Sequence, residues 1–244
     1  TGWSYETIII ITGIGVTCYT MLGGIEAVIW TDVIQVIILF GGAIVSVIIL
    51  LAGMPEGPGQ LFEIAAQKQK FSLGNWRPDL MAPTAWVVLI YGLIENLRNF
   101  GVDQNYVQRY QVTQSVKAAS RSVWIAAIAY IPVSALFLFI GTALFSFYTA
   151  NAQLLPASLE GSLTGDKIYP YFIATQFPVG LRGLLIAAIF AAAMSSIDSS
   201  LNCVSTLTLL DFYKRYINPG AGEKKSIKLL RVYTVVWGVL GTLT

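Results

Sequence analysis

Six long apolar stretches, separated by polar segments, constrain this sequence more than any other feature. A helix that crosses a bilayer needs about 20 mostly apolar residues. The lipid core holds no water to satisfy an open strand edge, so stretches of this kind are expected to be helices. The sequence therefore predicts an all-α membrane protein with about six transmembrane helices, at residues 7–23, 33–52, 85–107, 123–148, 183–210 and 229–244.

The composition excludes several other classes of protein. Charged residues make up 11% of the chain, whereas a soluble domain carries about 25%. The chain has no histidine, and both of its cysteines lie inside apolar stretches, so a zinc or haem site and a serine–histidine dyad are not expected. The basic residues lie in short clusters, which argues against a nucleic-acid partner. We therefore do not expect an enzyme.

The distribution of lysine and arginine predicts the orientation in the membrane. Loops on one side carry nine of these residues and loops on the other side carry five. Because the more basic side of a membrane protein faces the cytoplasm, the loops at residues 108–122 and 211–228 are expected to be cytoplasmic. This pattern is typical of a multi-pass protein of the cell membrane. The chain starts without a methionine and ends within an apolar stretch, so we expect a single transmembrane domain, residues 1–244, that is a fragment of a longer chain.

Asp32 is an acid in a position where lipid is expected. It lies about two turns into a helix that is predicted to start near Gly24, which is too deep for its carboxylate to reach the interface easily. Intramembrane ionisable groups are costly and usually serve a function. Asp32 is therefore predicted either to bind an alkali cation or to pair with an arginine of another helix.

The third apolar stretch becomes polar half-way along its length. A run of polar residues follows Ile94 and includes Glu95, Asn96, Arg98 and Asn99. A helix with such a second half cannot face lipid, and secondary transporters use discontinuous helices of this kind around an aqueous site. The alternative is a short span that ends near Ile94, with the polar residues already in water.

Small and hydroxyl-bearing residues share one helical face in the segment 191–200. On a helix, Ala192, Ser195, Ser196 and Ser199 lie on the same side. Small residues allow close helix packing, but hydroxyl and carbonyl oxygens are also the ligands that hard cations prefer. Asp198 favours the cation hypothesis, because packing alone does not require a carboxylate.

Tyr130 precedes Pro132 in the fourth apolar stretch, where a proline removes a helical hydrogen bond. The tyrosine is predicted to line a cavity beside the proline or to take part in ordinary packing.

Three segments resemble the sodium/solute symporter family, which includes sodium–glucose, iodide and bacterial sialic acid transporters. They are residues 23–35, 103–110 and 187–202, and they follow the order of the family's motifs. The Trp-Thr-Asp-Val-Ile-Gln sequence at residues 30–35 is most similar to the bacterial sialic acid symporters. The resemblance implies a LeuT-type fold of two inverted repeats, of which this chain would supply core helices four to nine.

The resemblance also implies a function and two cation sites. A relative of this family would import a small organic solute, such as sialic acid, a sugar or a related organic acid, with one or two Na⁺ ions by alternating access. The general Na⁺ site would use the carbonyl of Ala192 and the hydroxyls of Ser195 and Ser196, with its other ligands from N-terminal helices that this chain lacks. A second site would use Asp32, Asp198, Ser195 and Ser199.

The sequence departs from the family at several of these positions. Relatives usually have serine or threonine where this chain has Asp198, and two acids so close together require a cation or a proton between them. The resemblance places Asn96, Asn99 and Tyr130 at positions that bind substrate in the sugar-transporting branch, where Asn99 replaces a tyrosine and Tyr130 a lysine. An ion channel or a sensor domain on the same fold is the alternative function.

Overall fold

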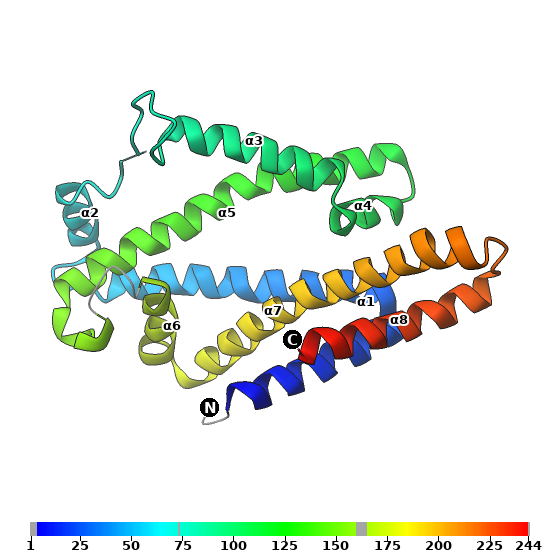
Figure 1. Cartoon of the computed structure of the whole chain (residues 1–244). Helices are drawn as coiled ribbons and strands as arrows, with labels where there is room; N and C mark the ends of the chain where they lie inside the picture. Colours follow the sequence, from blue (N-terminus) through cyan, green and yellow to red (C-terminus); the bar gives the residue numbers. More distant parts are fainter. Residues whose placement is uncertain (1–3, 73, 160–164, 244) are drawn as a thin grey trace. The chain divides into compact units, whose positions relative to one another are not determined.

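The computed structural model describes residues 4–72, 74–159 and 165–243, and for residues 25 and 27 it describes the backbone alone (Figure 1). Within these ranges the chain forms helices, turns and loops but no strand, so the predicted all-α fold is confirmed. The α-helices are α1 Tyr5–Ala52, α2 Pro58–Gln67, α3 Ala85–Gly101, α4 Gln104–Gln111, α5 Val116–Ala150, α6 Gly165–Gln176, α7 Val179–Leu207 and α8 Glu223–Leu243. Short 3-10 helices span Ala152–Leu154 and Ala157–Leu159, and a π-helix, Thr208–Ile217, continues α7.

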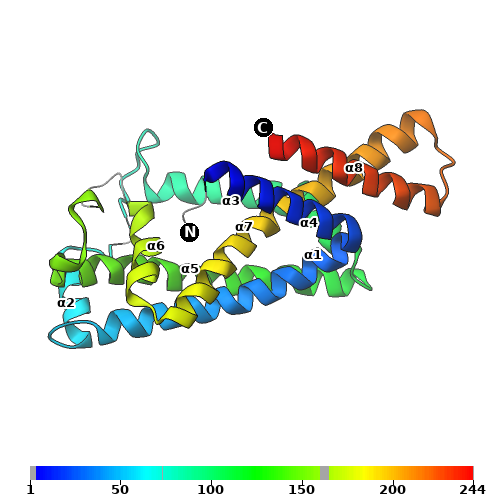
Figure 2. The ribbon, with the colours of Figure 1, turned by 90° about the horizontal axis from the view of Figure 1, so that it is seen from below.

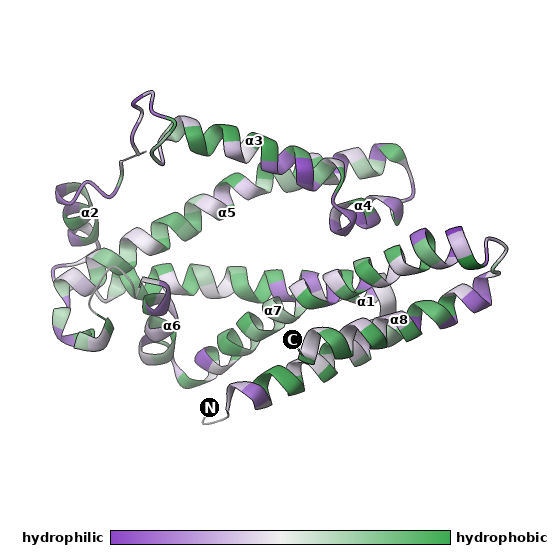
Figure 3. Ribbon diagram, in the orientation of Figure 1, coloured by the Kyte–Doolittle hydropathy of each residue, from purple (hydrophilic) through white to green (hydrophobic). Residues whose placement is uncertain are grey.

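Five segments within the described residues are long and apolar enough to cross a membrane: Tyr5–Gly24, Val28–Ala52, Val116–Ala150, Val179–Ile217 and Glu223–Leu243. They correspond to five of the six predicted helices. The remaining predicted helix, at residues 85–107, corresponds in part to α3. This helix has 17 residues and is about 26 Å long, slightly less than the ~30 Å hydrocarbon core. Figure 3 shows that α3 is hydrophobic over its first part and hydrophilic toward α4.

Gly24 divides α1 into the two helices that the sequence predicts. Its backbone angles, φ 56° and ψ −152°, are not helical, and only glycine reaches this region without steric cost. A Cβ atom on Gly24 would meet no other atom within 4 Å. Backbone conformation, and not lack of space, therefore requires glycine at this position.

The third predicted helix is broken at Val102 and Asp103, between α3 and α4. Asp103 starts α4, where its Oδ1 accepts a hydrogen bond of 2.8 Å from the backbone N–H of Asn105. The helix itself continues to Gly101, so the alternative of a membrane span that ends near Ile94, with the polar residues in water, stays open. The side-chain cap compensates the helical hydrogen bonds that are lost at the break.

Both predicted cytoplasmic loops contain more helix than expected. Residues 108–111 belong to α4 and residues 116–122 to α5, while the π-helix extends through Lys214 and Arg215 to Ile217. The non-helical connections are residues 112–115 and 218–222. The sequence predicted helix ends at residues 107 and 210 and a helix start at residue 123, but a helix can continue beyond the apolar part of its sequence. The side of the membrane on which these segments lie stays a prediction.

The chain divides into two compact units, and the second comprises Leu39–Ile186. Its core is apolar and aromatic, and α2 packs against α5 in it. Phe172 of α6 is fully buried, with its ring 5.7 Å from that of Phe147 and 5.9 Å from that of Phe177, both in edge-to-face geometry. Such contacts favour one arrangement of the rings.

The first unit comprises residues 1–38 and 187–244, and in it α8 lies against the first part of α1 (Figure 2). Two glycines permit this close approach. A Cβ on Gly13 would lie 2.8 Å from Cγ2 of Thr242, and a Cβ on Gly238 would lie 2.6 Å from Cγ2 of Thr17. Each helix thus offers a glycine to a threonine of the other, a reciprocal form of small-residue packing in membranes.

Candidate cation site

Asp198 is the most deeply buried acid of the described residues, with no exposed surface. It lies on α7, and its Oδ2 accepts a hydrogen bond from the hydroxyl of Tyr19 on α1. Its Oδ1 accepts a longer bond, 3.3 Å, from Ser199. Within the described ranges its hydrogen-bond donors are thus neutral hydroxyls, and it is in no salt bridge. A buried carboxylate requires a compensating charge.

Asp32 reaches the same face of α7 from the second part of α1. Its Oδ1 accepts a hydrogen bond from the hydroxyl of Ser195. Ser195 precedes Asp198 by three residues on α7, so the two carboxylates lie about one helical turn apart. Two negative charges at about 5 Å repel each other by roughly 3 kcal/mol at an effective dielectric of 20. This repulsion favours a cation or a proton between them.

The oxygen atoms of this cluster suit a hard monovalent cation. A serine hydroxyl that donates its proton to a carboxylate keeps two lone pairs, which can face a metal ion. Hard cations take carboxylate, hydroxyl and carbonyl oxygens. Within the part of the chain that the structure describes, no group of three or more His, Cys, Asp and Glu side chains comes together. Two carboxylates among serines therefore fit Na⁺ better than zinc.

Ala192 and Ser196 lie next to this cluster on α7. Ala192 is half-buried and Ser196 is exposed, and the carbonyl of Ser196 accepts a hydrogen bond of 2.9 Å from Ser200. α7 is regular through both residues, which keeps Ala192, Ser195 and Ser196 on neighbouring turns of one face. The structure thus brings together Asp32, Asp198, Ser195 and Ser199. Ser196 instead lines a pocket with Trp237 and Leu240 of α8.

Tyr19 is the member of the cluster that sequence reasoning missed. It lies in the first apolar stretch, 179 residues before Asp198, where an aromatic residue indicates ordinary packing. Thr17 and Thr20, both buried, flank it with Cys18 in an otherwise apolar helix. This group of hydroxyls is the one local signal that could have pointed to Tyr19.

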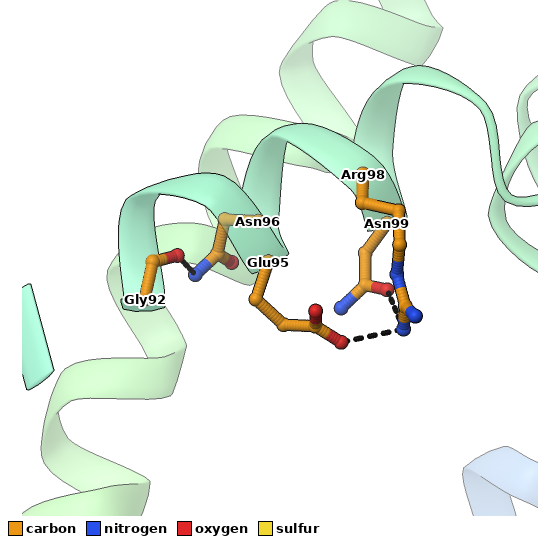
Figure 4. A network of polar contacts seen from close by, with 5 residues as sticks. All are labelled: Gly92, Glu95, Asn96, Arg98 and Asn99. Carbon is orange, nitrogen blue, oxygen red and sulfur yellow. Dashed lines mark hydrogen bonds and ion pairs between the residues drawn. The ribbon is translucent and has the colours of Figure 1, made fainter. Parts of the chain in front are cut away.

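The polar part of α3 lies in the other unit and forms a local network (Figure 4). The Arg98 guanidinium makes a salt bridge with Glu95 and donates a hydrogen bond of 3.2 Å to Oδ1 of Asn99. The side-chain amide of Asn96 donates a bond of 2.7 Å to the carbonyl of Gly92, one turn earlier. The pairing of Glu95 with Arg98 leaves the two amides on a segment without net charge.

Tyr130 lies on α5, in the same unit as α3, and 72% of its side chain is exposed. It thus has no packing partner that encloses it among the described residues. Pro132, one half-turn later, is accommodated within a continuous α5. Both predicted roles of Tyr130, in lining a cavity beside Pro132 and in ordinary packing, stay predictions.

Fold and site together define a class: a multi-pass α-helical membrane protein with a buried oxygen-lined cluster between the broken helix α1 and the regular helix α7. The sequence profile described as the sodium:solute symporter family matches residues 1–244. The chain belongs to this family. The match confirms the predicted family, the multi-pass location in the cell membrane and the expectation that the chain is not an enzyme.

Several similar proteins of known function are sodium-coupled transporters. The sodium/sialic acid symporter SiaT of Proteus mirabilis is 40% identical over 98% of this chain and 48% of its own length. The sodium/sialic acid symporter NanT of Aliivibrio fischeri is 38% identical over 93% of this chain and 45% of its own length. The sodium/glucose cotransporter of Vibrio parahaemolyticus is 33% identical over 89% of this chain.

The fold is similar to a solved structure of a Na⁺-coupled sialic acid symporter in its substrate-bound, outward-open state, which was described as having a novel Na⁺ site. The TM-score is 0.89 at 36% identity, over 100% of this chain and 51% of that one. The predicted partial LeuT-type architecture is thus confirmed. The chain spans about half the length of the relatives that it matches.

Proposed function

We propose that this chain is part of a sodium-coupled secondary active symporter that imports a small organic solute by alternating access. Sialic acid, a sugar or a related organic acid is the proposed solute class. Support comes from family membership along the whole chain and from the sialic acid symporters among its relatives. The chain covers about half of such proteins, so the activity is proposed for the full transporter.

The burial of Asp198 beside the Asp32–Ser195 pair carries this proposal. Asp198 is fully buried and hydrogen-bonded to the neutral hydroxyls of Tyr19 and Ser199. Burial of an acid without a bound cation costs several kcal/mol. A coupling ion that binds between the two acids would supply the missing charge, and its departure would destabilise the closed arrangement. That is the thermodynamic link a symporter needs between ion and conformation.

We assign two Na⁺ sites to this face of α7. The general site would comprise the carbonyl of Ala192 and the hydroxyls of Ser195 and Ser196. The second would comprise Asp32, Asp198 and Ser199, and would share Ser195. The contacts of Ser195 with Asp32 and of Ser199 with Asp198 support the second assignment. The spacing of Ala192, Ser195 and Ser196 on one helical face supports the first.

Asn96, Asn99 and Tyr130 are proposed to contact the solute. The Glu95–Arg98 salt bridge removes net charge from this part of α3. The amide atoms of Asn96 and Asn99 that are not used in their local hydrogen bonds would therefore select a polar neutral group. Cysteine in place of Asn96 or Asn99, in active full-length protein, should react with a membrane-impermeant thiol reagent and be protected by the solute. Met81, fully exposed before α3, is a control position that should react with or without solute. Inert cysteines at both asparagines would contradict the assignment.

The remaining partners follow from the exposed apolar surface. On α3 and the first half of α5, large apolar side chains such as Leu93, Ile94, Trp124 and Ile131 are more than 60% exposed. A soluble monomer rarely leaves so many neighbouring large apolar side chains exposed. We propose that the bilayer and further helices of the same protein cover them, with residues 1–244 as one part of a single transporter domain.

Sodium-dependent uptake by the full-length protein tests this function. Vesicles should accumulate labelled sialic acid above its external concentration when an inward Na⁺ gradient is present, and should stop when K⁺ replaces Na⁺. Labelled glucose in parallel vesicles identifies the solute class. A channel would equilibrate its substrate without accumulation, and a sensor domain would bind without uptake. Either result would overturn the proposal.

A further inference from the structure

A groove with two chemically different ends runs along α8 in the first unit. Its volume is about 550 Å³, and Met21 of α1 forms part of its wall. Lys224, Lys228 and Arg231 line it near the start of α8. Val232, Val235 and Val236 line it further along the helix. The groove is therefore basic at the end next to the 218–222 connection and apolar toward the middle of the helix.

The three cations converge because of their spacing. Positions 224, 228 and 231 are four and three residues apart, so their side chains lie on one face over two turns of α8. All three are exposed, and within the described ranges none of them forms a salt bridge. Lys225, between them in sequence, points elsewhere and lies over the ring of Tyr213. The basic end thus offers three charges to an external anion.

The apolar end of the groove distinguishes a lipid from a soluble anion, because a soluble anion would contact only the basic end. The three valines are between 37% and 47% exposed, although they lie in the interior of a segment apolar enough to span a membrane. From residue 224 to residue 236 the helix rises about 18 Å. One leaflet contributes about 15 Å of hydrocarbon, so the groove has the length of a headgroup region plus part of one acyl chain.

We propose that this groove binds an anionic phospholipid, with the phosphate at Lys224, Lys228 and Arg231 and an acyl chain along Val232, Val235 and Met21. Basic pockets between transmembrane helices on the cytoplasmic side are suited to such headgroups. The predicted orientation places the start of α8 on that side. The occupant is a bilayer lipid, because charge and apolar length are matched in one continuous groove. The binding is independent of sodium and solute.

The test is lipid retention by the full-length protein in mild detergent, measured by native mass spectrometry with equal amounts of phosphatidylglycerol and phosphatidylcholine. The wild-type protein should retain phosphatidylglycerol in preference. Lys224→Gln with Lys228→Gln should weaken that binding about thirtyfold, since each cation near the surface contributes about a fivefold factor. Retention of phosphatidylcholine should not change, which shows that the variant is folded.

Lys117→Gln with Arg121→Gln is the matched control. These residues are also exposed, four apart and near the start of a spanning helix, α5, on the same predicted side. The control should leave lipid preference intact. Three results would overturn the proposal: no preference in the wild-type protein, as expected if another segment of the protein fills the groove; equal loss in the control; or displacement of the lipid by glycerol phosphate alone, which would indicate a soluble anion.

Discussion

The two compact units bury different kinds of side chain. In the Leu39–Ile186 unit, fourteen of the buried residues described are hydrophobic and five are polar or charged. In the other unit five are hydrophobic and seven are polar or charged, with Asp198 among them. An apolar interior stabilises a fold by packing, whereas a polar one stabilises it only when every group has a partner. One interior therefore supports structure by apolar packing, and the other contains Asp198 of the proposed cation site.

The largest effect is expected in the apolar unit, from Phe172→Ala. Phe172 is fully buried among aromatic rings, and its truncation should lower the free energy of unfolding by about 3–5 kcal/mol. Thermal unfolding of the full-length protein in detergent measures this loss. Phe62→Ala, at a ring that is 46% exposed, should cost less than half as much. Phe172→Ala should leave the sodium dependence of uptake nearly unchanged. A large change in that dependence would contradict the contrast between a structural apolar unit and an ion-binding polar unit.

Asp32→Asn should have the largest effect on sodium in the polar unit. It weakens the charged hydrogen bond from Ser195 and removes a charge from the second site. The sodium concentration for half-maximal uptake should rise roughly ten- to hundredfold, and the Hill coefficient should fall toward one. Asp198→Ser restores the residue that is usual in relatives and should retain uptake. Asp211→Asn, at an exposed acid of the π-helix, should change neither value.

Tyr19→Phe should raise the half-saturating sodium concentration about tenfold, because it removes the hydroxyl that donates to Asp198. In an Asp198→Ser background the same change should have little effect, which a double-mutant cycle would show. Tyr5→Phe, at an exposed tyrosine of the same helix, is the control. An undiminished effect in the double variant would mean that Tyr19 acts by packing alone.

Ser196→Ala should produce the smallest effect, a several-fold loss of sodium activation from one missing hydroxyl. Ser205→Ala is the matched change on the same helix. Ser205 is fully buried, and no partner of its hydroxyl is found among the described residues, so its loss should be nearly silent. Equal effects of both variants would remove Ser196 from the proposed site.

The predictions from sequence succeeded where the signal was local. Ser195, Ser196 and Ser199 lie within one short segment of α7, where helical spacing alone places them on a common face, and Asp198 lies in the same segment. Gly24 and the polar run after Ile94 marked the two breaks, because a membrane helix tolerates neither without a reason. The family motifs added the link between Asp32 and α7 that spacing cannot supply.

The predictions failed where the partner was distant or the helix was irregular. Thr17 and Thr20 are the one polar signal beside Tyr19, and they do not reveal its partner Asp198, which is 179 residues away. The π-helix was read as a loop because Asp211, Lys214 and Arg215 interrupt the apolar pattern. Hydropathy reports where a helix leaves lipid, and backbone hydrogen bonds decide where it ends.

The reciprocal glycine–threonine crossing of α1 and α8 has a consequence for how this sequence can evolve. A methyl group added at Gly13 would collide with Thr242, and one added at Gly238 would collide with Thr17. Neither glycine can change unless the opposite threonine becomes smaller at the same time. Among homologues, positions 13 and 242 should therefore vary as one pair and positions 17 and 238 as another. Drift at these four positions would be coupled across more than two hundred residues of sequence, whatever solute the transporter carries.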